Sequence, residues 1–188
     1  MSKIFCLETE WTKSIHDMKN RSSALNLLEF LENDPNTRIP FVFRKVATSE
    51  EFIYYIGHLD YDSYKSYNIV YLCFHGSDNT IGFADKNLMN LTDLATDFAG
   101  MFKGKNVHFG SCSTLNISED EIKEFKRISG ARMVSGYKDD VDCVDAFIFE
   151  LWLLNTIDKY PEYAGKRIKA LAEKQMPYYC NELQFIAI

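Results

Sequence analysis

The sequence lacks any apolar run long enough to cross a membrane. Its most hydrophobic stretch, Ala146 to Leu154, is shorter than a membrane-spanning helix and is interrupted by Glu150, so we interpret it as part of a buried helix. The first residues show no long apolar segment followed by a small-residue cleavage site. We therefore expect no signal peptide, no contact with a membrane and a cytoplasmic location.

Clustered positive charge is also missing. The formal net charge is −6, and lysines and arginines do not gather in any block. Because nucleic-acid binding relies on a basic surface that neutralises phosphates, we expect no nucleic-acid partner. The apolar fraction of 46% is that of an ordinary globular protein, and 188 residues suit one domain spanning 1–188.

The cysteines show none of the short, repeated spacings that zinc fingers and small disulfide frameworks use. Five are scattered along the chain: Cys6, Cys73, Cys112, Cys143 and Cys180. We therefore expect neither a disulfide framework nor a metal or other cofactor. A reducing compartment would leave a thiol free to act as a nucleophile.

Apolar, β-branched runs alternate with amphipathic segments along the whole chain. Strands are predicted at 3–7, 40–46, 68–76, 106–110, 132–136 and 183–188. Helices are predicted at 22–31, 48–58, 91–102, 118–128, 141–157 and from Pro161 to Pro177, with a small hairpin around 84–87 outside the main sheet. This order predicts an α/β fold, a three-layer sandwich with a mostly parallel central sheet.

Two of the predicted strands lead to reactive side chains. The run 68–76 ends in His75 and Gly76, and the run 106–114 passes Gly110 just before Cys112. With a helix between them and a right-handed crossover, the two strands are expected to be parallel and close in space. Ligands bind at the carboxyl ends of strands in open α/β sheets, so we expect His75 and Cys112 to meet there.

No histidine follows Cys112 in the sequence. The four histidines are His16, His58, His75 and His108. Papain-like enzymes and α/β-hydrolases place the histidine after the nucleophile, so both orders are excluded for Cys112. The remaining arrangement has the histidine upstream, one strand earlier.

This order, with His75 37 positions before Cys112, resembles that of the caspase-like cysteine peptidases. The run 73–76 (Cys-Phe-His-Gly) is similar to the His-Gly motif that closes the third strand of that fold. The run 110–114 (Gly-Ser-Cys-Ser-Thr) looks like the cysteine motif of bacterial CHAT-type relatives, and the segments 91–94 and 134–140 are also CHAT-like. The similarity covers about 68–154. The caspase glutamine before the cysteine and the glycine after it are absent.

The resemblance implies a caspase-like cysteine endopeptidase that acts on peptide or protein substrates. Cys112 would attack the peptide carbonyl, His75 would transfer protons, and the N–H groups of Gly76 and Cys112 would form the oxyanion hole. Asp139 and Asp140, in the loop after the strand 132–136, would favour arginine or lysine before the cleaved bond. These two aspartates could equally face water.

Other interpretations of the same residues stay open. A cysteine at a strand end is usually buried and inert, so the fold could instead serve as a non-catalytic binding or signalling module. We expect Cys73 and His108 to be structural. A metal site built from these two residues with His75 and Cys112 lacks the usual ligand spacings, and a flavodoxin-like nucleotide binder would need a Gly-rich loop after the first strand.

Overall fold

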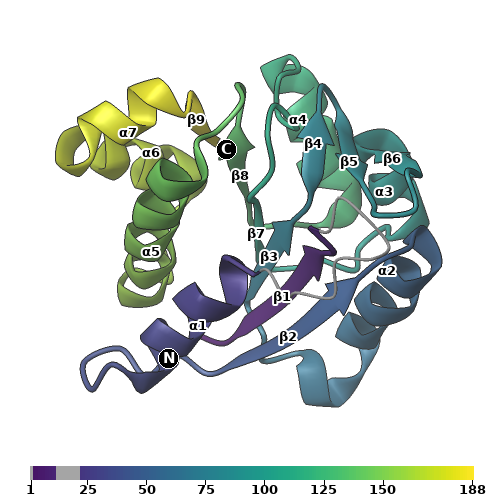
Figure 1. Cartoon of the computed structure of the whole chain (residues 1–188), viewed down its shortest axis with the longest axis horizontal. Helices are drawn as coiled ribbons and strands as arrows, with labels where there is room; N and C mark the ends of the chain where they lie inside the picture. Colours follow the sequence, from purple (N-terminus) through teal and green to yellow (C-terminus); the bar gives the residue numbers. More distant parts are fainter. Residues whose placement is uncertain (1, 12–21) are drawn as a thin grey trace.

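A computed structural model describes residues 2–11 and 22–188, in which helices cover both faces of a central sheet (Figure 1). The sheet has the strand order β2-β1-β3-β7-β8-β9. These strands are β1 (Ile4–Thr9), β2 (Phe41–Val46), β3 (Ile69–Cys73), β7 (Asn106–Phe109), β8 (Met133–Tyr137) and β9 (Phe185–Ala187). Neighbours pair in parallel except β8 and β9, which are antiparallel. The predicted α/β class with a mostly parallel sheet is confirmed.

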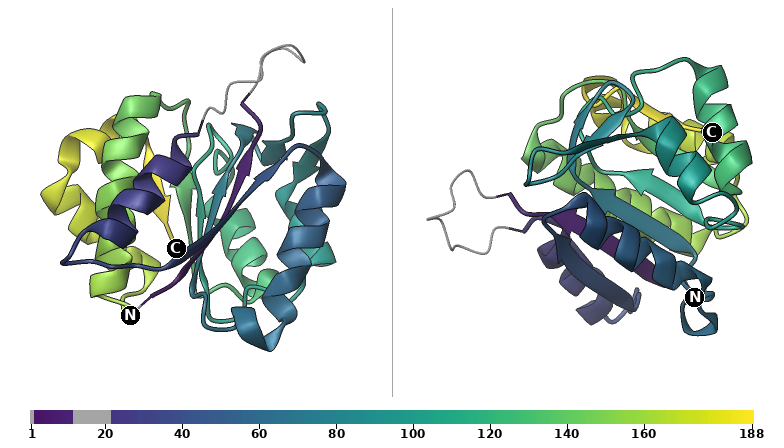
Figure 2. Two further views of the ribbon diagram at one scale, coloured as in Figure 1. Left: turned by 60° about the horizontal axis from the view of Figure 1, so that its bottom comes forward. Right: turned by 90° about the vertical axis from the view of Figure 1, so that its right-hand side faces the viewer.

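The helices form one layer on each side of this sheet (Figure 2). One layer contains α1 (Ala24–Asn33), α5 (Cys143–Lys159), α6 (Gly165–Gln175) and α7 (Pro177–Glu182). The other contains α2 (Ser49–Ile56), the short 3₁₀ turns Gly57–Asp60 and Asp62–Tyr64, α3 (Leu91–Asp97) and α4 (Glu119–Ser129).

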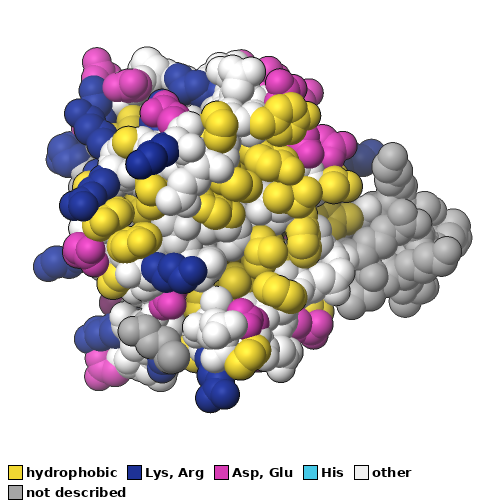
Figure 3. All heavy atoms as spheres, turned by 90° about the vertical axis from the view of Figure 1, so that its left-hand side faces the viewer, with side chains coloured by type: hydrophobic (Ala, Val, Ile, Leu, Met, Phe, Trp, Pro, Cys, Tyr) yellow, Lys and Arg dark blue, Asp and Glu magenta, His cyan; other side chains and the backbone are white. Residues whose placement is uncertain are grey.

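Hydrophobic side chains gather on the outer face of the first layer (Figure 3). Exposed examples on its helices are Phe30, Val144, Ile148 and Tyr178. None of the helices in the described ranges is long and apolar enough to span a bilayer.

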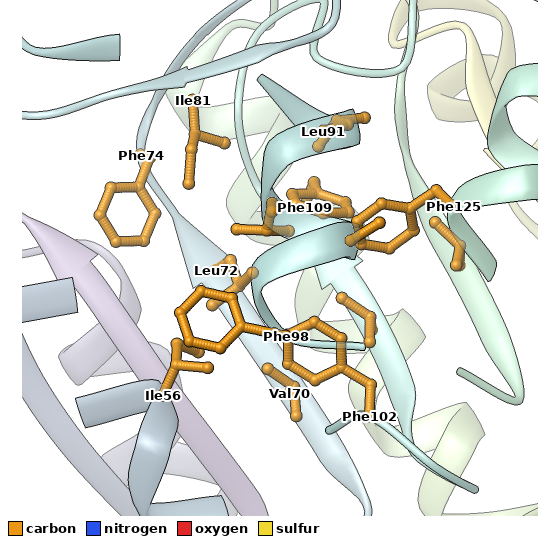
Figure 4. Close-up of a cluster of buried hydrophobic side chains, with 14 of the residues drawn as sticks. Ile56, Val70, Leu72, Phe74, Ile81, Leu91, Phe98, Phe102, Phe109 and Phe125 are labelled. Atoms are coloured by element: carbon orange, nitrogen blue, oxygen red, sulfur yellow. The ribbon is translucent and has the colours of Figure 1, made fainter. Parts of the chain in front are cut away.

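Successive side chains of each strand point to opposite faces of the sheet, which produces two separate cores. Val70 and Leu72 of β3 join the cluster beneath α2, α3 and α4 (Figure 4). Ile69, Tyr71 and Cys73 of the same strand face the other cluster, with α1 and α5.

A second, antiparallel sheet begins where β3 ends. Its strands are β4 (His75–Ser77), β5 (Thr80–Gly82) and β6 (Leu88–Asn90). The prediction of one strand over 68–76 was therefore wrong, because β3 stops at Cys73 and His75 starts β4. Phe74, between them, is buried in the same cluster as Ile81 of β5, and Figure 4 shows both side chains directed toward that core. The expected hairpin is the β5–β6 pair, to which β4 adds a third strand.

Both predicted capping residues begin helices. Ser118 forms the complete reciprocal capping box at the start of α4. Thr48 accepts the backbone N–H of Glu51 (3.2 Å), but the Glu51 carboxylate accepts the N–H of Ala47 (2.7 Å) rather than that of Thr48. The first turn of α2 is therefore capped as in a capping box, except that the glutamate bonds the N–H one residue earlier.

The C-terminal helices differ from the prediction in three places. A helix was expected to start at Pro161, but α6 begins at Gly165. The long helix was expected from Val141 and instead begins at Cys143, because the Asp142 carboxylate accepts the N–H groups of Val144 and Asp145. Pro177 was expected to end a helix. It also begins α7, because a proline in the first turn loses no intrahelical hydrogen bond.

Candidate functional site

The carboxyl ends of β3 and β7 lie side by side, as the sequence predicted. The strands pair in parallel with Leu72 opposite Phe109, and the N–H of Gly110 donates to the carbonyl of Leu72 (2.8 Å). The two chain segments that follow therefore leave the sheet at one edge (Figure 1).

A pocket of about 600 Å³ lies at this edge, and both His75 and Cys112 line it. Its lining also includes the apolar side chains Trp11, Phe74, Val141, Ala146 and Phe147. The polar groups Tyr71, Cys73 and Glu150 complete a wall formed by β3 and α5. The structure therefore brings both members of the predicted dyad to one concave surface.

The segment 110–116 after β7, here called the Cys112 loop, is held from two sides. The N–H of Ser113 donates to the carbonyl of Asp139 beyond β8 (3.0 Å), and the hydroxyl of Thr114 donates to the carbonyl of Thr80 in the small sheet (3.0 Å). Ser113 has φ = 50°, a left-handed conformation that is uncommon for a residue with a side chain. Cys112 itself is partly exposed as a free thiol.

Gly76 packs directly against this loop. A Cβ atom at position 76 would fall 2.1 Å from the carbonyl oxygen of Cys112 and 2.4 Å from Oγ1 of Thr114. No side chain fits in that space, so the sequence His-Gly is a steric requirement of the contact. The contact holds β4 against the Cys112 loop.

The backbone N–H groups next to this contact are not used by the sheets. Ser77 and Thr80 flank a two-residue turn and form a hydrogen-bonded pair of the β4–β5 ladder. Hydrogen-bonded and non-bonded pairs alternate in antiparallel sheets, so the N–H of Gly76 points away from β5. Within the described ranges, the N–H of Cys112 also has no acceptor.

His75 stands at the mouth of the pocket beside Trp11. The two rings meet edge to face, with their centroids 4.8 Å apart and an interplanar angle of 81°. The imidazole is still exposed on its other side. Partial burial disfavours the imidazolium and lowers the pKa of His75 below its usual 6.5, so the neutral form prevails at pH 7.

A buried polar cluster lies behind the pocket wall and centres on Glu150. The Glu150 carboxylate accepts the hydroxyls of Tyr71 and Tyr137, and Nε2 of His108 lies 3.2 Å from Oε1. Nδ1 of His108 lies 3.0 Å from the Ser135 hydroxyl. The imidazole of His108 is fully buried, whereas that of His75 faces the pocket.

Cys73 also lines the pocket, but in a different state from Cys112. It is buried beside Cys6, and burial raises the pKa of the Cys73 thiol well above its ordinary value. The structure therefore keeps this sulfur as an unreactive thiol.

The loop aspartates lie away from the pocket lining. Asp139 and Asp140 are exposed, and the Asp140 carboxylate accepts the Ser113 hydroxyl (3.0 Å). Their role in substrate binding stays a prediction.

The acidic residue that lines the pocket is Glu150. In the sequence, Glu150 stands out only because it interrupts an apolar helix. A single acidic residue in an apolar helix indicates a buried acid with polar partners, because acids are rarely buried without them.

Nowhere in residues 2–11 and 22–188 do three or more histidine, cysteine or acidic side chains gather in a way that could hold a metal ion.

Comparison with known proteins gives one family, and two caspases are among the similar solved structures. A family model described as "Family of unknown function (DUF6642)" matches residues 1–186, and no curated protein matches the sequence. The Drosophila initiator caspase Dronc superposes with a TM-score of 0.51 at 9% identity, over 92% of this chain and 71% of Dronc. Caspase-1 from Spodoptera frugiperda gives 0.50 at 12% identity, over 100% of this chain and 84% of that protein. The fold is therefore caspase-like, while the finer CHAT-type resemblance stays a prediction.

Gly76→Ala is expected to destabilise the protein by about 3 kcal/mol, because the new Cβ meets a backbone carbonyl that cannot move aside. Denaturant unfolding measures the loss. Gly57→Ala is the matched control: nothing lies within 4 Å of a Cβ there, and φ is −56°. The control should change stability by less than ~1 kcal/mol. Equal stability of the two variants would contradict the close approach at Gly76.

The imidazole of His75 is expected to titrate below pH 6.5 in the folded protein, and Trp11→Ala should raise that pKa toward 6.5 by exposing the ring. NMR titration of the histidine ring signals measures both values. His58 serves as the internal reference, since its ring contacts are with Tyr54, Tyr55, Tyr61 and Tyr64. A His75 pKa that does not respond to removal of the indole would show that Trp11 does not desolvate it.

Proposed function

Because the chain belongs to a family of unknown function, DUF6642, we propose a function from its site: a cysteine endopeptidase in which His75 and Cys112 form the catalytic dyad. The observation that carries the proposal is the shared pocket, in which both side chains face the same space. The backbone of the residue after His75 is also packed against the backbone of Cys112. The caspase-like fold supports the proposal.

The reaction begins with proton transfer from the Cys112 thiol to a base. His75 suits this role because its pKa lies below the usual value, so the ring is neutral and able to accept a proton at pH 7. The thiolate attacks the peptide carbonyl and forms a C–S bond, while the carbonyl oxygen takes the negative charge. The N–H groups of Gly76 and Cys112, which the sheets leave unused, donate to that oxygen.

The imidazolium of His75 then gives its proton to the leaving amine as the C–N bond breaks. This leaves a thioester on Cys112. Water attacks the thioester with His75 again acting as the base. The C–S bond then breaks, the imidazolium returns the proton to the Cys112 sulfur, and the carboxylic acid product leaves. All five cysteines are free, and we place the enzyme in the reducing cytoplasm, with peptides or proteins as substrates.

Cys112→Ala is expected to reduce peptide hydrolysis by at least about 1,000-fold without loss of stability, because alanine removes the nucleophile and fits the same space. His75→Ala should lower the rate to a similar degree. Cys143→Ala is the matched control, since this exposed thiol lines the same pocket and should be dispensable. Hydrolysis of a fluorogenic peptide library measures all three variants.

Alkylation by iodoacetamide tests the dyad without a substrate. Cys112 should react faster than Cys180, whose pKa is raised to about 11, chiefly by burial. The Cys112 rate should fall in His75→Ala. If the library is not cleaved and Cys112 is no more reactive than Cys180, the peptidase assignment is wrong and the fold serves as a binding module.

A further inference from the structure

Glu150 is an acidic side chain in an apolar part of the pocket. It is 6% exposed, it belongs to the long helix α5, and it lines the same pocket as His75 and Cys112. A Cβ on Gly110, two residues before Cys112, would come within 2.7 Å of its Oε1. The carboxylate therefore lies against the strand end that leads to the proposed nucleophile.

The partners of Glu150 hold it in place without supplying a permanent positive charge. Tyr71 and Tyr137 each donate a hydroxyl, and burial raises the pKa of both phenols well above the ordinary value, so they remain donors. His108 is the third partner. In the described part of the chain, no lysine or arginine lies within ion-pair distance of Glu150.

A second carboxylate lies close behind the same wall. Glu8 is fully buried; its Oε1 accepts the N–H groups of Ser23 and Ala24 (3.1 and 3.2 Å). Its Oε2 has no hydrogen-bond partner among the described residues. Ser23 lines the pocket, and so does Cys73, the residue opposite Glu8 in the β1–β3 register.

Both carboxylates act on the Cys73 thiol. Glu8 and Glu150 both add to the increase in the pKa of Cys73, which burial dominates. On the other side of Glu8, Lys45 is its opposite residue in the β1–β2 register, and the Lys45 Nζ lies 3.3 Å from the Glu10 carboxylate. Both acids therefore lie within electrostatic range of the Cys73 thiol, at the pocket wall.

We infer that this pocket selects a cationic side chain, with Glu150 as the specificity-determining residue and Glu8 as a second source of negative charge. The inference rests on the proposed peptidase function and names its substrate class: chains with arginine or lysine before the cleaved bond. A buried carboxylate without a cation is costly, and a substrate cation that enters the pocket offsets that cost.

The walls of the pocket suit the rest of such a side chain. Trp11, Val141 and Phe147 offer apolar surface to a methylene stem, as expected when a long basic side chain buries its stem and directs its charge to a polar group. A guanidinium is planar, packs on aromatic rings and donates in several directions, so it can bond the Glu150 carboxylate while its plane lies against an aromatic side chain of the wall. We therefore expect arginine to be preferred over lysine. Aspartate is disfavoured by the same negative charge.

The kinetic test compares peptides that differ only in the residue before the cleaved bond. The wild-type protein should cleave after arginine and lysine, with kcat/KM at least about 100-fold above that for leucine or aspartate. Glu150→Gln keeps the shape of the side chain and removes its charge. Its amide oxygen still accepts one set of hydrogen bonds, while its NH2 group can donate to a tyrosine hydroxyl, which also accepts. In this variant kcat/KM should fall roughly 100-fold for the arginine peptide and change little for the leucine peptide. The rate of Cys112 alkylation should stay the same.

Asp145→Asn is the matched control, because it removes one negative charge from α5, the helix that carries Glu150, but outside the pocket lining. It should leave the preference unchanged. A preference for leucine or aspartate in the wild-type protein would overturn the inference while leaving the peptidase proposal in place. A basic preference that survives Glu150→Gln and disappears in Asp140→Asn would transfer the specificity to the loop after β8.

A binding measurement separates this inference from catalysis. Calorimetry on the Cys112→Ala protein compares N-butylguanidinium with N-butylurea, which has a similar shape but no charge. The cation should bind and the urea should not, and Glu150→Gln should abolish the difference. Equal binding of the two compounds overturns the inference. Selective binding of the cation without cleavage of any peptide would support the pocket chemistry and refute the peptidase proposal.

Discussion

The candidate site depends on one backbone contact, between Gly76 and the carbonyl of Cys112. Two parts of the molecule meet at this point. One is the small antiparallel sheet that carries His75, and the other is the loop that follows β7, a central strand of the large, mostly parallel sheet. The hydrophobic core fixes one partner. Phe74, two residues before Gly76, and Ile81, the cross-strand partner of Gly76, are buried in the same core cluster. The hydrogen bonds of Ser113 and Thr114 fix the other.

The arrangement of the large sheet can be predicted from the sequence because it follows from local patterns. Buried parallel strands require continuous apolar runs, and the helices between them determine which strands can be neighbours. The pairing of β3 with β7 follows from these patterns alone. The change of sheet at Phe74 does not, since hydrophobicity shows that a residue is buried without showing in which sheet its neighbours hydrogen-bond.

The acidic wall of the pocket could not be assigned from sequence for a different reason. Asp139 and Asp140 attract attention because they follow a strand, but position along the chain does not determine which way a loop side chain faces. Glu150 is stabilised by groups from three strands, Tyr71, His108 and Tyr137, which are distant from it in the sequence. Such a partnership becomes visible only when the tertiary structure brings the donors to one place.

His75 and Gly76 are consecutive residues of one short strand, and this imposes a mechanical coupling on the site. The general base and one of the two oxyanion donors of the proposed mechanism belong to a single rigid unit, anchored by aromatic packing of Phe74 with Phe52 and Phe83. Any displacement of the small sheet moves both groups together relative to Cys112. A displacement of β4 therefore removes the base and the oxyanion donor from Cys112 at the same time. The activity of the site depends on this one shared motion rather than on independent motions of the two groups.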